Sequence, residues 1–282
     1  MRKAINIWSF PFDWDLEKKI RIAAEAGFEG FEPDLSDDGP LGLKSTATEI
    51  REVARQIRSH GLEITSLATG LYWGANAASE SARNRRSAAR ILRKQIETAA
   101  RLGVDTILVV PGAVGADFIP DSEVVPYDLA WNRAGELITN ALPLANKLGI
   151  NIGIENVWNK FLLSPLEMAT FVDQFNDPLV GVYFDVGNAL ANGYPEQWIH
   201  ILGKRIKRIH VKDYRRAVGT VDGFVDLLSG DVNWAAVAAA IREIDTNGWC
   251  TAEMIPPAPF YKHSPETLIH NTARAMDGIF AL

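Results

Sequence analysis

The sequence has a single cysteine, no long hydrophobic run and no excess of positive charge. Cys250 cannot form an internal disulfide, and its apolar neighbours favour a small core residue over a nucleophile, so we expect a cytoplasmic protein. Because no run of about 18 uncharged apolar residues occurs, we expect no membrane-spanning helix and no membrane partner. The opening MRKAINIWSF lacks the apolar stretch and cleavage site of a signal peptide and is typical of a first strand.

Nucleic-acid and nucleotide binding are also disfavoured. The formal net charge is −6, which argues against a protein that binds the nucleic-acid backbone. An arginine-rich run at 83–94 lies within a long amphipathic pattern, so we expect it to be the exposed face of a helix. The sequence contains neither a Walker-type phosphate loop nor a Gly-x-Gly-x-x-Gly motif after a strand.

Short apolar runs alternate with longer amphipathic ones along all 282 residues. The expected strands cover residues 4–8, 28–34, 62–70, 104–112, 151–156, 180–185, 206–213 and 248–255. The expected helices cover residues 15–27, 46–61, 81–103, 131–149, 164–175, 195–203, 232–245 and 264–280. Eight strand–helix pairs fit a (β/α)₈ TIM barrel, which typically needs about 250 residues. With no linker or composition break, we predict one domain over residues 1–282.

Two helix starts carry specific capping patterns. Thr46 and Glu49 have the spacing of a capping box, whereas Thr48 and Arg51 do not complete one. Ser164 is followed by proline, as expected for an N-cap with proline at the first helical position. A further proline inside the pattern at 131–149 is a possible kink.

Four strand-like runs in the second half of the chain each lead to a residue that can bind a metal ion. They read NIGIEN, VGVYFDVGN, IKRIHVKD and WCTAEMI, and the candidate ligands are Glu155, Asp185, His210 and Glu253. Three carboxylates and one imidazole suit a hard or borderline divalent cation. Side chains at the ends of successive strands meet at the C-terminal face of a (β/α)₈ barrel. We therefore predict one divalent metal ion at that face.

The pieces around these ligands resemble the xylose isomerase-like TIM barrels. The matching pieces are IEN, FDVGN, IHVKD and AEM at the four ligands, and SGDVNW at 229–234. This family includes sugar phosphate isomerases and epimerases, among them ketose 3-epimerases of the tagatose/psicose type and L-xylulose 5-phosphate 3-epimerases. The resemblance covers essentially the whole chain. It implies that all four residues bind one ion, Mn²⁺, Mg²⁺ or Co²⁺, with Zn²⁺ as a further option.

The resemblance also implies that Glu155 and Glu253 are the acid/base pair. The ion would hold a ketose carbonyl oxygen and stabilise the enediolate left when the neighbouring C–H loses its proton. One glutamate would remove that proton and the other would return one to the opposite face, which inverts the stereocentre. We therefore predict a metal-dependent sugar or sugar phosphate epimerase, with 3-epimerisation favoured. Return of the proton to the neighbouring carbon would give an aldose–ketose isomerase, and this alternative stays open.

Further residues are candidates for binding the sugar. Arg216 and Asn188 lie where relatives place an arginine and a histidine at the substrate, and Phe161 stands where free-ketose epimerases tend to have a second glutamate. Because Asn188 is not a histidine, a multi-metal cluster like that of the related apurinic endonucleases is disfavoured. The remaining candidates follow or end strands and offer polar groups or an apolar wall: Glu32, Tyr72, Trp158 and Lys212.

Two other functional classes remain as alternatives. A metal-dependent nuclease for abasic DNA would need more ligands and a basic face, and a non-catalytic sugar-binding protein would need only the pocket. For partners, we expect a small sugar or sugar phosphate and no nucleic acid. The resemblance further implies a homo-oligomer, either a dimer or a tetramer.

Overall fold

The computed structural model describes residues 1–244, 248–254 and 263–282 of the chain. Within these residues, eight strands form one parallel sheet in the order β3-β2-β1-β10-β7-β6-β5-β4, and β8 and β9 form an antiparallel pair. The strands of the parallel sheet are β1 (Arg2–Asn6), β2 (Gly30–Glu32), β3 (Glu63–Ile64), β4 (Thr106–Val109), β5 (Asn151–Glu155), β6 (Val180–Asp185), β7 (Ile206–Val211) and β10 (Trp249–Ala252). The short pair is β8 (Asp213–Tyr214) and β9 (Phe224–Val225).

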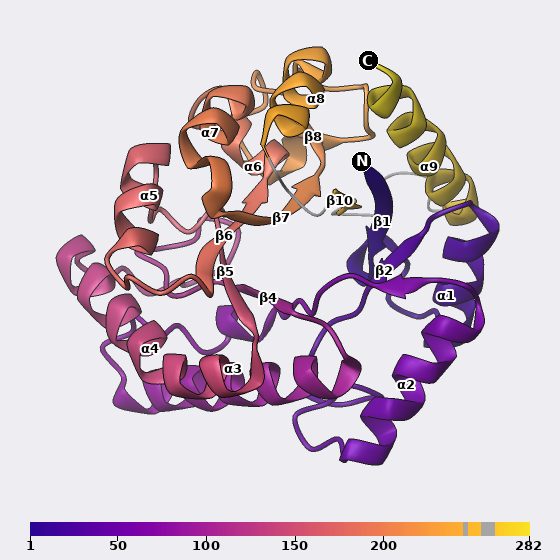
Figure 1. Cartoon of the computed structure of the whole chain (residues 1–282). Helices are drawn as coiled ribbons and strands as arrows, with labels where there is room; N and C mark the ends of the chain where they lie inside the picture. The colour runs from indigo at the N-terminus through magenta and orange to yellow at the C-terminus, as the bar shows by residue number, and fades with distance from the viewer. Residues whose placement is uncertain (245–247, 255–262) are drawn as a thin grey trace. The chain divides into compact units, whose positions relative to one another are not determined.

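Helices follow the strands of the parallel sheet (Figure 1). They are α1 (Leu16–Glu25), α2 (Ala47–Ser59), α3 (Ala82–Leu102), α4 (Tyr127–Leu148), α5 (Pro165–Asp173), α6 (Val186–Leu190), α7 (Pro195–Leu202), α8 (Trp234–Glu243) and α9 (Pro265–Ala281). The described part of the chain also contains the short 3₁₀ helices η1 (Ile7–Ser9), η2 (Leu71–Trp73), η3 (Gly203–Arg205) and η4 (Val221–Gly223). Parallel strands alternating with helices confirm the predicted (β/α)₈ class.

The chain packs as two compact units. The first comprises Met1–Pro33, Ala54–Thr65 and Phe184–Leu282, and the second comprises Asp34–Val53 and Ser66–Tyr183. In the first unit, β1 pairs with β2 and β10, β10 pairs with β7, and α8 packs against α7 and α9 (Figure 1). In the second unit, β4 pairs with β5, β5 pairs with β6, and α3 packs along α4 (Figure 1). That the whole chain acts as one domain stays a prediction.

Local sequence explains where the helices begin. At the start of α2, the backbone N–H of Thr46 donates to Oε2 of Glu49 over 2.7 Å, and the Glu49 N–H donates to Oγ1 of Thr46 over 3.3 Å. This reciprocal pair confirms the predicted capping box. Ser164 caps α5 through the N–H of Glu167, with Pro165 at the first helical position, also as predicted.

Several boundaries differ from the sequence-based expectations. The third strand is Glu63–Ile64 rather than 62–70, and beyond it Leu67 forms only an isolated bridge to Ile107. Helix α4 begins at Tyr127 rather than at residue 131, and it runs on through Pro143 to Leu148. The β8–β9 pair and α6 were not predicted. Residue 255 of the expected last strand and residue 245 of the expected eighth helix lie outside the described residues.

The strands that lead to the candidate ligands are buried. All six residues of β6 and all four of β10 are buried, and β7 is buried at all but one position. A strand buried on both faces is typical of a parallel sheet covered by helices, and it fixes the side chain at its end in a dry environment. None of the described helices is both long enough and apolar enough to cross a membrane.

Candidate metal centre

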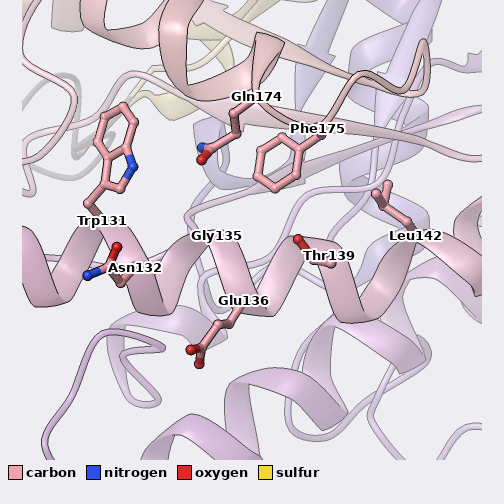
Figure 2. Close-up of a pocket in the computed structure, with 8 residues that line it drawn as sticks. All are labelled: Trp131, Asn132, Gly135, Glu136, Thr139, Leu142, Gln174 and Phe175. Atoms are coloured by element: carbon pink, nitrogen blue, oxygen red, sulfur yellow. The ribbon is translucent and has the colours of Figure 1, made fainter.

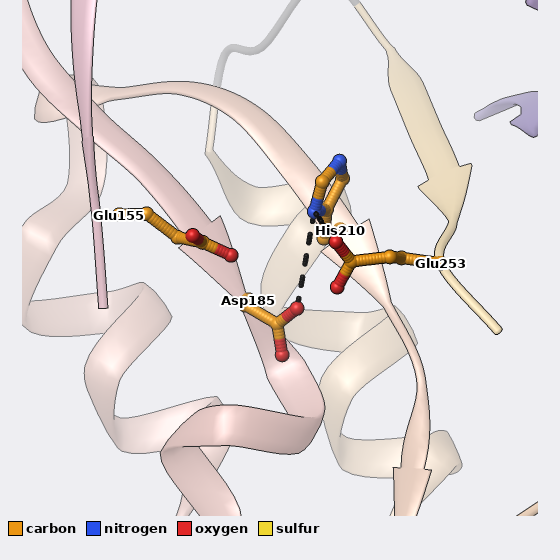
Figure 3. Close-up of side chains that lie close together, drawn as sticks. All are labelled: Glu155, Asp185, His210 and Glu253. Atoms are coloured by element: carbon orange, nitrogen blue, oxygen red, sulfur yellow. Dashed lines mark ion pairs between the residues drawn. The ribbon is translucent and has the colours of Figure 1, made fainter. Parts of the chain in front are cut away.

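Three of the four predicted ligands come together within the first unit. Asp185 ends β6, His210 lies in β7, and Glu253 directly follows β10. One donor atom of each lies within 4.8 Å of the others, and all three side chains are buried (Figure 3). In the β10–β7 register, His210 pairs with Thr251, and the Glu253 N–H extends the ladder to the Val211 carbonyl. Glu253 lies two residues beyond Thr251, so its side chain is the diagonal neighbour of His210 on the same face.

The distances in this cluster suit ligands that share an ion. Nδ1 of His210 lies 3.9 Å from Oδ2 of Asp185, the pair joined by the dashed line in Figure 3, and 3.7 Å from Oε1 of Glu253. Both separations exceed the donor–acceptor distance of a direct hydrogen bond. Two ligand atoms bound about 2.1 Å from one ion lie about 3.0–4.2 Å apart, depending on the angle between them. The three groups therefore fit one small divalent cation.

Asp185 has a second, structural role. Its Oδ1 accepts a 2.6 Å hydrogen bond from the backbone N–H of Asn188 and so caps α6. Complete burial raises the pKa of Asp185, and the nearby Lys212 ammonium opposes that rise. The cap holds the carboxylate in place, so that its Oδ2 faces His210.

A buried ammonium lies among these carboxylates. Nζ of Lys212 is 3.1 Å from Oδ2 of Asp185 and also contacts Oε2 of Glu253. The same ammonium lies 4.8 Å from the centre of the Phe224 ring. Its predicted contact with a substrate oxygen stays a prediction, and the structure shows it as a counter-ion to two candidate ligands.

A fully buried carboxylate lies behind His210. Oε2 of Glu32, at the end of β2, is 2.7 Å from Nε2 of His210 and accepts a 2.5 Å hydrogen bond from Nδ2 of Asn6. All three side chains have no exposed surface. We predicted Glu32 as a sugar-binding residue, which stays a prediction. The sequence analysis missed Asn6, although a polar residue within the apolar run at 4–8 was a signal that could have found it.

The charge of this buried region also fits a divalent cation. The buried region holds the carboxylates of Asp185, Glu253 and Glu32, and the ammonium of Lys212 contacts the first two. Buried negative charge is costly unless cations or hydrogen bonds offset it. A divalent cation would offset the excess that the lysine leaves, and the oxygen and nitrogen donors suit Mn²⁺, Mg²⁺, Co²⁺ or Zn²⁺.

The fourth predicted ligand, Glu155, belongs to the second unit. It ends β5 and is buried, and its strand register places it opposite Tyr183 of β6. Its role as a ligand and as a catalytic group stays a prediction.

The other predicted sugar-binding residues lie in varied places. Arg216 is exposed, and its guanidinium lies 4.9 Å from the centre of the Tyr194 ring, while its backbone N–H donates to Asp231. Asn188 is buried in α6, and Trp158 is half-buried after β5. The predicted roles of these three residues in sugar binding stay predictions.

Tyr72 is held by a hydrogen bond inside the second unit. It lies in η2, and its buried hydroxyl donates to Oε1 of Gln95 over 2.9 Å. Burial raises the pKa of this hydroxyl. The amide of Gln95 in turn donates to two backbone carbonyls. The structure thus gives Tyr72 a packing role, and its predicted place in a sugar-facing wall stays a prediction.

A separate surface pocket lies over α4 and the segment after α5 in the second unit (Figure 2). Its volume is about 560 Å³. It is lined by Trp131, Asn132, Gly135, Glu136, Thr139, Leu142, Gln174 and Phe175. With one acidic side chain and no histidine in its lining, it lacks the ligand set of the cluster around His210.

Two curated proteins match parts of the sequence. An uncharacterised protein of Methanocaldococcus jannaschii is 26% identical over 191 residues, which make up 63% of this chain and 60% of that protein. Inosose dehydratase 1 of Bacillus cereus is 30% identical over 91 residues, 31% of this chain and 30% of that protein. The chain therefore spans less than two thirds of the length of either relative.

Solved structures share the fold over the whole chain. D-psicose 3-epimerase, solved in the presence of D-fructose, has a TM-score of 0.81 at 17% identity and covers 100% of both chains. The IOLI protein with a bound zinc atom has a TM-score of 0.79 at 18% identity and covers 100% of this chain and 98% of that one. At such identities, the likeness shows the fold and leaves the reaction open.

The match to a known family extends over most of the sequence. Residues 20–272 match the family described as the xylose isomerase-like TIM barrel. This agrees with the parallel sheet of eight strands and with the resemblance inferred from the ligand-bearing runs. The chain therefore belongs to the xylose isomerase-like TIM barrel family.

Proposed function

We propose that this chain is a divalent-metal-dependent sugar epimerase that inverts the carbon next to a ketose carbonyl, most specifically as a ketose 3-epimerase. The observation that carries this proposal is the buried cluster of Asp185, His210 and Glu253 at the ends of β6, β7 and β10. Family membership supports it. So do the ketose 3-epimerase and the zinc-containing protein among the structures with the same fold.

In the proposed site, one divalent ion would be held by Asp185, His210, Glu253 and Glu155. Support for Glu155 comes from the β5–β6 register, in which it pairs with Tyr183, two residues before Asp185 on the same strand. Residues two apart on a strand point to the same face, so Tyr183 and Asp185 share one face of β6. The bound ion would supply a Lewis acid for the ketose carbonyl.

The protein's own part in the reaction is proton transfer by two carboxylates. We assign the two proton transfers at C3 to Glu155 and Glu253. One of them removes the proton, and the other delivers a proton to the opposite face. The two exchange roles in the reverse reaction. Burial of Glu253 limits access of water to the carboxylate that would hold the proton. The Lys212 ammonium, in contact with Oε2 of Glu253, orients that carboxylate.

Hydrogen exchange tests this proposal. A panel of ketoses and ketose phosphates is incubated with the chain and Mn²⁺ in deuterated water, and NMR follows deuterium at each carbon. We expect deuterium at C3 together with the C3 epimer. Glu253→Gln keeps the shape of the side chain but removes the carboxylate that exchanges protons, so both signals should fall by at least about 10²-fold.

Matched controls make the outcome specific. Glu243→Gln alters an exposed carboxylate of α8 and should leave exchange unchanged. Full exchange in Glu253→Gln would contradict the assigned role. Deuterium at C1 with an aldose product would favour the aldose–ketose isomerase, and a bound ketose that gains no deuterium would favour a sugar-binding protein.

A further inference from the structure

A line of hydrogen bonds runs from the backbone of η1 to the buried His210, entirely within the first unit. The N–H of Trp8 donates to Oδ1 of Asn6 over 2.7 Å, and Nδ2 of Asn6 donates to Oε2 of Glu32 over 2.5 Å. The same Oε2 lies 2.7 Å from Nε2 of His210. On the far side of the ring, Nδ1 faces Asp185 and Glu253.

The backbone end of this line fixes the direction of every bond in it. A backbone N–H can only donate, so the oxygen of the Asn6 amide must face Trp8 and the NH₂ group must face Glu32. Oε2 of Glu32 therefore acts as an acceptor, and a carboxylate oxygen has lone pairs for a second donor. That second donor is the Nε2–H of His210. Nδ1 of His210 is then unprotonated, and its lone pair faces Asp185 and Glu253.

We propose that Glu32, oriented by Asn6, is a positioning residue that holds His210 in its Nε2–H tautomer and so prepares Nδ1 as a metal-binding nitrogen. This inference rests on the metal site of the proposed function, and it adds a role for two residues outside the ligand set. A carboxylate that accepts the second N–H of a metal-binding histidine both fixes the ring and raises the basicity of the other nitrogen. Loss of such a partner typically weakens metal binding about 10–100-fold.

The geometry favours this role for Glu32 over direct sugar binding. Its side chain has no exposed surface, and its Oε2 already meets two groups, Nδ2 of Asn6 on β1 and Nε2 of His210 on β7. The register of β1 with β2 pairs Asn6 directly with Glu32, so the two side chains are held side by side by the backbone ladder. His210 lies on β7, one strand beyond β10 on the other side of β1.

The first test reads the tautomer directly and needs no variant. The metal-free chain, labelled with ¹⁵N at its histidines, is studied by long-range ¹H–¹⁵N NMR, and His210 is assigned from the spectrum of His210→Gln. We expect a protonated Nε2 and an unprotonated Nδ1. A proton on Nδ1 of His210 would overturn the proposal.

The second test measures Zn²⁺ affinity by calorimetry, with activity not involved. Glu32→Gln keeps the volume of the side chain but removes its charge, and we expect affinity to fall about 10–100-fold. Thr251→Val is the matched control, because Thr251 is equally buried and pairs with His210 in the β10–β7 register, yet lies outside the hydrogen-bonded line. It should bind Zn²⁺ as the wild type does.

The two failures can be told apart. Wild-type Zn²⁺ affinity in Glu32→Gln, with a raised KM for a ketose, would overturn the positioning role and make Glu32 a sugar-binding residue. Reduced affinity in Glu32→Gln, in a chain that exchanges no ketose hydrogen, would uphold the positioning role and overturn the epimerase. If Glu32→Gln does not fold, the wild-type NMR spectrum still decides the tautomer.

Discussion

Lys212 sets the charge at the centre of the buried cluster. Its ammonium contacts Asp185 and Glu253, and its stem passes close to Gly187. A Cβ at Gly187 would lie 2.5 Å from Cγ of Lys212, so only glycine leaves room for the lysine at this point. The position of Lys212 is thus built into the fold. An ammonium here repels a divalent cation that shares the same carboxylates.

Removal of this charge should strengthen metal binding. We expect Lys212→Met to bind Mn²⁺ about tenfold more tightly, equivalent to about 1.4 kcal/mol, as measured by calorimetry. The matched control is Lys204→Met, which alters an exposed lysine of η3 and should change nothing. Weaker Mn²⁺ binding in Lys212→Met would show instead that the ammonium holds the carboxylates in place.

Cys250 should be inert in the folded chain. Burial raises the pKa of its thiol from 9.0 to about 12, so the thiol stays protonated at pH 8. We expect iodoacetamide to leave Cys250 unmodified at pH 8, as judged by mass spectrometry, until a denaturant is added. Because folding raises this pKa, the protonated thiol contributes fully to the free energy of unfolding below pH 9.0. That contribution is lost as the pH rises toward 12. Rapid labelling of the native chain would contradict this.

At the scale of elements, α2 depends on its capping box. Thr46→Ala removes the acceptor for the Glu49 N–H, and we expect the free energy of unfolding to fall by about 1 kcal/mol in urea titrations. Thr48→Ala is the matched control, because Thr48 lies inside the helix and caps no backbone group there. Equal stability of the two variants would contradict a stabilising box.

The sequence predicted the strands and helices best where their signals are local. Apolar runs and caps marked the eight parallel strands and the starts of α2 and α5. The start of α4 was missed because its N-cap is Pro126, which offers no side-chain hydrogen bond, so the segment carries none of the usual capping residues. Elements of two residues, such as β8 and β9, are too short to show a period.

The β8–β9 pair is held by contacts that are distant in sequence. The buried carboxylate of Asp213 accepts hydrogen bonds from the backbone N–H groups of Gly230 and Val232 and from Nε1 of Trp234. A Cβ at Gly230 would lie 2.2 Å from Oδ1 of Asp213, so this loop requires glycine at that point. These hydrogen bonds to Asp213 depend on where the loop returns to the sheet. The local sequence pattern does not specify that position.

At the scale of the whole chain, the candidate ligands could be predicted because each lies close to the end of a recognisable strand or directly follows one. Asp185, His210 and Glu253 were chosen on that ground, and the structure brings them together. The support behind His210 could not be predicted, because Asn6 and Glu32 are about 200 and 180 residues away in sequence and meet the histidine only through the order of the strands. Long-range partners of this kind follow from register, which one sequence does not specify.

Metal binding should stabilise the folded chain. A ligand that binds only the folded state at 100 times its Kd adds about 2.7 kcal/mol, so we expect Mn²⁺ to raise the Tm by several degrees and a chelator to reverse the rise. The Tm of the Asp185→Asn variant should not change when Mn²⁺ is added. A Tm that Mn²⁺ shifts equally in wild type and Asp185→Asn would place the ion elsewhere.

The most direct test of the central claim is the number of Mn²⁺ ions bound per chain, measured by electron paramagnetic resonance titration. A single ion held by Asp185, His210 and Glu253 predicts one Mn²⁺ per wild-type chain and loss of that ion in His210→Gln. A wild-type chain that binds no Mn²⁺, or a His210→Gln chain that binds it equally well, would contradict the account.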